Sequence, residues 1–63
     1  MARLIYRWLN VGETISHEGR AYRVLARPVP AKWGKVSIEV RDIAARTDTA
    51  ITAPANAQAW RWR

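Results

Sequence analysis

The chain has 63 residues, enough for one small domain, and carries a formal net charge of +6. It has no cysteine, which excludes disulfides and thiolate metal sites. We expect no zinc site, because His17 is the only histidine and no set of ligands has the right spacing. No apolar run approaches the roughly 18–20 residues of a membrane span, and the N-terminus lacks a cleavage site. We expect a cytoplasmic protein with no cofactor, no metal and no membrane partner.

The sequence is rich in arginine and tryptophan. Of the eleven cationic residues only Lys32 and Lys35 are lysine, and the chain contains four tryptophans. Arginine forms bidentate bonds to phosphate, and tryptophan offers a flat stacking surface. This combination predicts binding to nucleic acid, DNA or RNA, or to an acidic protein surface. The alternative is that a richness in arginine and alanine reflects coding composition and keeps the protein soluble.

The first twenty residues predict short strands and tight turns. Residues 4–9 fit a helical face and a strand face equally, and their β-rich neighbours favour a strand. Gly12 marks a turn before a short strand at 14–15. The polar segment 16–20 ends in glycine, which predicts a hairpin turn with His17 as a solvated residue.

Two alternating segments predict the central strands. Residues 35–41 place Val36, Ile38 and Val40 on one face and polar side chains on the other. Residues 20–27 behave similarly, with Tyr22, Val24 and Ala26 on one face and Arg23, Leu25 and Arg27 on the other. In a regular strand this spacing puts Arg20 on the Tyr22 face.

The remaining segments are less regular. Residues 28–34 predict a loop, because two prolines remove ladder donors, and Gly34 can take a positive φ there. A last strand is expected over residues 47–52, with Asp48 at a turn, and Pro54 ends it. The tail 55–59 is either a short helix or a loose arm.

Together these segments predict an all-β fold. We expect residues 1–63 to form a single small SH3-like barrel of five or six short antiparallel strands, with a short helix or arm within 55–63. The stretches 11–15, 18–25 and 36–43 also resemble a known pattern. A "G-x-x-I-x-x-x-G-x-x-Y-x-V-L" hairpin, a basic loop and an alternating strand are typical of the N-terminal, KOW-like barrel of elongation factor P. The resemblance covers residues 11–52 and implies the fold of SH3-like barrels, many of which bind RNA, DNA or ribosomal surfaces.

Catalytic residues are not expected. Ser16 and His17 are neighbours, and neighbours on a strand point to opposite faces, so they cannot form a nucleophile–base pair. The sequence has no phosphate-cradling glycine loop, metal motif or nucleophile elbow. We therefore expect a binding protein rather than an enzyme.

Three groups of residues are candidate contacts for a nucleic acid or another partner. They are Lys32, Trp33 and Lys35 in the loop; Trp60, Arg61, Trp62 and Arg63 at the C-terminus; and Arg20, Arg23 and Arg27 along one strand. Each has a structural alternative. Trp33 could cover the barrel mouth as a lid, the terminus could be an edge strand whose tryptophans complete the core or a homodimer, and the arginines could be a solvated face. Since the core lacks phenylalanine, we expect it to include Trp8 and one of Trp60 or Trp62, with Trp33 left for a partner.

Two functions follow. The leading hypothesis is a small basic nucleic-acid-binding barrel that contacts phosphates through Arg and Lys and bases through Trp. The alternative is a protein-interaction module, of the kind that small phage-type proteins use to dock on a larger host protein, with Trp60, Trp62, Trp8 and Tyr6 as anchors.

Overall fold

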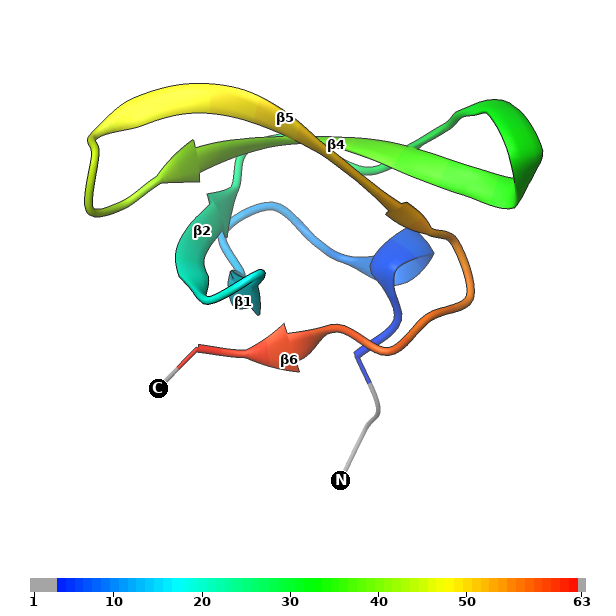
Figure 1. Ribbon diagram of the computed structural model, residues 1–63, viewed down its shortest axis with the longest axis horizontal. Helices are drawn as coiled ribbons and strands as arrows, with labels where there is room; N and C mark the ends of the chain where they lie inside the picture. Colours follow the sequence, from blue (N-terminus) through cyan, green and yellow to red (C-terminus); the bar gives the residue numbers. More distant parts are fainter. Residues whose placement is uncertain (1–3, 63) are drawn as a thin grey trace.

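A strongly curved antiparallel sheet forms the body of the molecule (Figure 1). The computed structural model describes residues 4–62. Its strands are β1 (Thr14–His17), β2 (Arg20–Val24), β3 (Val29–Pro30), β4 (Lys35–Asp42), β5 (Thr47–Pro54) and β6 (Trp60–Arg61). The strand order is β3-β4-β2-β1-β6, and β5 pairs with β4 along its full length. The expected small, all-β, barrel-like fold is confirmed.

Alternation along β4 builds the core. Val36, Ile38 and Val40 point inward and are buried, while the residues between them face outward. They join one hydrophobic cluster with the other buried apolar residues, which are Tyr6, Leu9, Ile15, Tyr22, Val24, Ile51, Ala53 and Ala59. The predicted inner faces of the two central strands are therefore correct.

Two tight turns hold the strands in register. Glu18 and Gly19, between the paired residues His17 and Arg20, have φ values of 50° and 79°. Positive φ at both central positions is what a type I′ hairpin turn requires, and it confirms the predicted hairpin.

The second turn, residues 43–46, joins β4 to β5 and corrects an expectation. An Asp42 carboxylate oxygen accepts a bond from the Ala45 amide at 3.1 Å, and the Arg46 amide donates to the Asp42 carbonyl at 2.7 Å. Asp48 was expected at a turn. It lies instead inside β5, opposite Arg41, because Asp42 closes the turn earlier.

The chain ends differ from the predicted strand and helix. Tyr6–Trp8 forms a 3₁₀ turn, η1, rather than a strand. The amides of Tyr6 and Arg7 donate to the carbonyls of Ala57 and Ala55, each at 3.1 Å. Residues 55–59 are thus neither a helix nor a loose arm, because these bonds to the N-terminal segment keep them irregular and docked.

His17 is not the solvated turn residue that the sequence predicted. It ends β1, and its side chain is only 15% exposed. Its Nδ1 shares a hydrogen bond of 2.9 Å with the Tyr6 hydroxyl, and its ring meets Tyr6 and Tyr22 edge-on. The two-residue turn at Glu18 and Gly19 causes the difference, since it leaves His17 in the ladder on the inner face.

The predicted loop 28–34 contains a short edge strand. Val29 and Pro30 pair with Ser37 and Val36 of β4. An edge strand tolerates proline because its missing amide can face away from the ladder. Gly34 has a φ of 69°, as expected. No helix in the described part of the chain is long and apolar enough to span a membrane.

Two of the three isoleucines in the β4–β5 hairpin, one buried and one partly exposed, provide a matched test of this core. Ile38 is fully buried, whereas Ile43 is 40% exposed. We expect Ile38→Ala to lower the free energy of unfolding by about 2–5 kcal/mol through lost burial and a cavity. Ile43→Ala should cost under about 1 kcal/mol. Urea unfolding followed by circular dichroism measures both, and equal losses would contradict the described orientation of β4.

Candidate functional site

The outer face of strands β6, β1, β2 and β4 gathers exposed aromatic and cationic side chains. Paired residues on neighbouring strands point to the same side of a sheet. Ile15 and Tyr22 are paired and buried, so their neighbours Thr14 and Arg23 point outward. The pairing of β6 continues this face, because the Trp62 amide donates to the Thr14 carbonyl at 3.1 Å.

Two rows of outward side chains cross these strands. The first runs Trp62, Thr14, Arg23, Arg41. The second runs Trp60, Ser16, Ala21, Ile43. We name the surface that includes Trp60, Trp62, Arg23 and Arg41 the tryptophan–arginine platform. Small side chains lie between the indoles and the guanidinium groups, and strands are spaced about 4.8 Å apart, so the platform is shallow and about 15 Å wide.

The tryptophans of the platform are accessible. Trp60 is 63% exposed and Trp62 is 46% exposed. Trp8 is exposed as well, so the expectation that the core would include Trp8 and one terminal tryptophan was wrong. Aliphatic residues and two tyrosines fill the core instead. The C-terminus does form the final edge strand that was one alternative, β6. Its indoles are exposed, so they do not complete the core of the chain.

The charges of the platform are incompletely balanced. Arg41 donates to Asp48 at 2.7 Å, and this hydrogen bond holds the pKa of the Asp48 carboxyl below its usual value. Arg23 lies directly opposite Arg41 on the next strand. Within residues 4–62 it has no carboxylate at ion-pair distance. Like charges directly opposite each other repel, so a bound anion would stabilise this pair.

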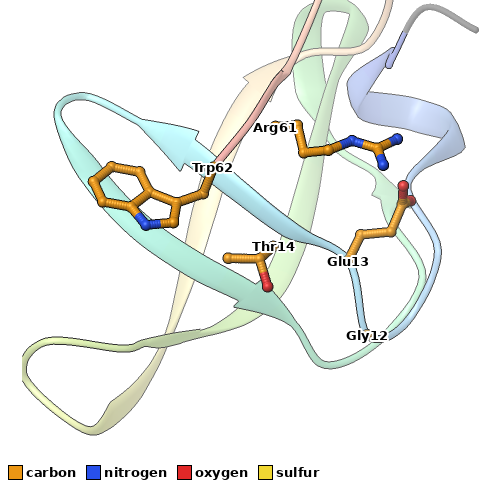
Figure 2. Close-up of a pocket in the computed structure, with 5 residues that line it drawn as sticks. All are labelled: Gly12, Glu13, Thr14, Arg61 and Trp62. Carbon is orange, nitrogen blue, oxygen red and sulfur yellow. The ribbon is translucent and has the colours of Figure 1, made fainter. Parts of the chain in front are cut away.

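A pocket of about 280 Å³ opens at the rim of the platform (Figure 2). Its lining residues are Gly12, Glu13, Thr14, Arg61 and Trp62. In Figure 2 the Arg61 side chain extends toward Glu13, on the opposite side of β6 from Trp62. Gly12, Glu13 and Thr14 were missed by the sequence analysis, because the pairing of β6 with β1 leaves no signal in the sequence.

The other predicted arginines do not join the platform. Arg20 lies on the Tyr22 face, as its spacing predicted, and donates to buried Asp42 at 2.7 Å. Arg27 is exposed in the connection between β2 and β3, four residues beyond Arg23. Arg63 lies outside the described residues.

The predicted loop site stands apart. Lys32, Trp33 and Gly34 form the turn η2 at the tip of the β3–β4 hairpin, which the Ala31 amide closes by donating to the Lys35 carbonyl at 2.8 Å. Trp33 is 88% exposed, so it is not a lid over the barrel. Lys35 and Arg41 are six residues apart on β4, about 20 Å. The structure therefore separates the loop residues from the platform.

Trp33 adopts a strained backbone conformation. Its φ and ψ are 59° and 43°, in the left-handed region. This conformation costs an L-residue roughly 1–2 kcal/mol and is an outlier for a bulky side chain. The indole at the tip is 88% exposed, so burial does little to offset this cost.

Groups suited to metal binding or nucleophilic catalysis do not converge in the described part of the chain. No cluster of three His, Cys, Asp or Glu side chains is found among residues 4–62. Ser16 faces outward with Trp60, whereas His17 faces the tyrosines of the core. Comparison with family models, curated proteins and solved structures finds no match to this chain. The resemblance to the elongation factor P barrel therefore stays a prediction.

The ion pair between Arg20 and buried Asp42 makes the stability of the fold depend on pH. The pKa of the Asp42 carboxyl is lowered by its bond from the Ala45 amide and by Arg20. Because the pKa of Asp42 is lower in the folded protein than in the unfolded chain, ionised Asp42 stabilises the fold. This stabilisation is fully present at pH values above the unfolded-chain pKa of about 3.9. This contribution is lost as the pH falls through the folded-state pKa. We expect Asp42→Asn to unfold at a lower urea concentration than the wild type at pH 7. The difference between the two urea midpoints should shrink as the pH falls below about 4.

Asp48→Asn is the matched control. Its carboxylate also pairs with an arginine, but both side chains are more than half exposed, so solvent screens the pair. It should shift the urea midpoint at pH 7 much less than Asp42→Asn does. A gap between Asp42→Asn and the wild type that persists unchanged at pH 2.5 would contradict the assigned role of the Asp42 charge.

Proposed function

We propose that this protein binds nucleic acid, DNA or RNA, through the tryptophan–arginine platform. The observation that carries the proposal is the joint exposure of Trp60 and Trp62 beside the opposed pair Arg23 and Arg41. Indoles stack on bases of any sequence, and guanidinium groups bind phosphates. The role is binding rather than catalysis, and the absence of cysteine is compatible with a reducing cytoplasm.

The platform favours single strands over duplexes. A base can stack on Trp60 or Trp62 only when its flat face is free, and in a duplex the neighbouring base pairs cover that face. The side chains between the indoles and Arg23 are small, so a strand can lie across them without a steric barrier. Trp62 directly follows β6, and its amide bond to Thr14 continues the pairing of that strand. The two tryptophans are two residues apart in an extended segment, about 7 Å, which gives two successive stacking positions along one nucleic-acid strand.

Electrostatics supports the same occupant. Arg41 is already paired with Asp48, whereas Arg23 has no carboxylate at ion-pair distance among residues 4–62. A phosphate at Arg23 would therefore supply the counter-charge that this guanidinium lacks. The net charge of +6 adds a long-range attraction to any polyanion. Because counterion release drives such binding, the affinity should fall steeply with rising salt.

An acidic protein surface is the alternative partner. Ile43 ends the row that begins with Trp60 and is partly exposed, and an apolar side chain of this kind suits a protein interface. A pull-down from lysate separates the two functions. Recovery of one protein in constant ratio after nuclease treatment would favour protein docking, whereas loss of partners after nuclease would favour nucleic acid.

Titration of a labelled single-stranded oligonucleotide, followed by fluorescence anisotropy, tests the platform. We expect the combined substitution Trp60→Ala with Trp62→Ala to weaken binding at least tenfold, since each stacked base contributes about 1–3 kcal/mol. Arg23→Gln should reduce the slope of log affinity against log salt by about 0.7, the contribution of one phosphate contact on a single strand.

Arg27→Gln and Val29→Ala are the matched controls, because they remove an exposed cation and an exposed apolar side chain outside the platform. Both should leave affinity within about twofold. Absence of binding to any DNA or RNA at low salt would overturn the proposal. Equal losses for Arg23→Gln and Arg27→Gln would show diffuse charge attraction in place of a defined site.

A further inference from the structure

The tip of the β3–β4 hairpin has the same chemistry as the platform at a different place. Lys32 and Lys35 flank the exposed indole of Trp33. None of the residues at 29–37 is acidic. The left-handed backbone at Trp33 holds its indole away from the barrel, which is the orientation that stacking on an external ring requires.

The N-terminal turn η1 adds a second indole beside this tip. The Ala55 amide donates to the Gly34 carbonyl at 3.0 Å, and the Ala55 carbonyl accepts from the Arg7 amide at 3.1 Å. Ala55 thus connects η1 and the tip directly. The Arg7 guanidinium lies 4.9 Å from the Trp8 ring centre, and Trp8 is exposed. The region therefore presents two tryptophans and three cations from separate parts of the chain.

Glu39 separates this region from the platform. The outward residues of β4 run Lys35, Ser37, Glu39, Arg41. A phosphate backbone that followed β4 from Arg41 to Lys35 would pass over the exposed Glu39 carboxylate, which repels it. Among residues 4–62 this carboxylate has no ion-pair partner. The arrangement disfavours one continuous track and favours two separate sites about 20 Å apart.

We propose that the hairpin tip is a second single-strand-binding site, so that one molecule holds two nucleic-acid strands at once. This inference rests on the proposed function of the platform. Trp33 stacks on a base of the second strand, and Lys32 and Lys35 bind its phosphates. The platform, with two adjacent indoles and two arginines, is the tighter of the two sites. Such a protein would bring two strands together without base pairing between them.

A two-strand capture assay tests the inference on the full chain. A biotinylated six-nucleotide oligonucleotide on beads is incubated with protein, washed, and offered a labelled, non-complementary oligonucleotide of the same length. We expect the wild type to retain the labelled strand. Trp33→Ala should reduce its capture about tenfold, the loss expected for one stacked base. The combined substitution Lys32→Gln with Lys35→Gln should reduce capture further at moderate salt.

Calorimetric titration with the free oligonucleotide supplies the second readout. The wild type should bind two oligonucleotides per chain, and the Trp33→Ala variant should bind one with unchanged platform affinity. Sedimentation equilibrium of the complex must show a single protein chain. A dimer could bridge two strands through two platforms, and capture by a dimer alone would overturn the second site. Val29→Ala, an exposed apolar position on the same hairpin, is the control that should keep full capture.

The outcomes distinguish the two proposals. No binding of the first oligonucleotide would overturn the proposed function itself. Binding of one oligonucleotide per monomer by the wild type, or full second-strand capture by Trp33→Ala, would overturn the second site and leave the platform intact. Insertion of Trp33 into anionic vesicles, seen as a blue-shifted emission, without second-strand capture would also overturn it.

Discussion

The pairing register of β1 decides both faces of this molecule. Ile15 pairs with Tyr22 on one side and with Arg61 on the other. That register sends Ile15 into the core and leaves Thr14 facing outward between Trp62 and Arg23. Because strand side chains alternate with a period of two, a slip of one residue would expose Ile15 and bury polar residues. The core therefore fixes the platform: its tryptophans and arginines are brought together by the same pairing that buries the isoleucine.

The small core explains why indoles stay outside. Its fully buried residues are Leu9, Ile15, Ile38, Val24 and Val40, and the aromatic volume comes from Tyr6 and Tyr22. Tyr6 fits because its hydroxyl bonds His17, and its buried position raises the pKa of this hydroxyl. A chain this short has a narrow stability margin. Exposing every tryptophan of such a chain forgoes burial energy that its fold could use, and it leaves these indoles accessible for the contacts that we propose.

Sequence reasoning succeeded where local rules decide the structure. The alternation of residues 35–41 and the glycine after Glu18 predicted β4 and the first hairpin, since period and turn chemistry are local. It failed at η1 and at His17, and it left β6 as one of several alternatives. The conformations of all three depend on bonds to segments some eleven to fifty residues away. The composition identified Arg23, Trp60 and Trp62 as candidates, but only the strand order places them on one face. Arg41 was missed because a single alternating strand looks like any solvated outer face.

The distribution of the five carboxylates argues against arginine richness as a mere solubility device. Asp42 and Asp48 pair with Arg20 and Arg41, and Glu13 accepts a bond from the Asn10 amide at 2.6 Å. Glu18 lies near His17. A protein that needed only solubility would gain most from mixed charges spread evenly over its surface. Here the carboxylates lie in turns and in the β4–β5 hairpin. Among residues 4–62, Arg23 at the platform and Lys32 and Lys35 at the hairpin tip have no carboxylate at ion-pair distance, and they lie near exposed indoles. Coding composition could supply the arginines, but it does not account for Arg23 beside Trp60 and Trp62 at the platform or for two lysines beside Trp33 at the hairpin tip.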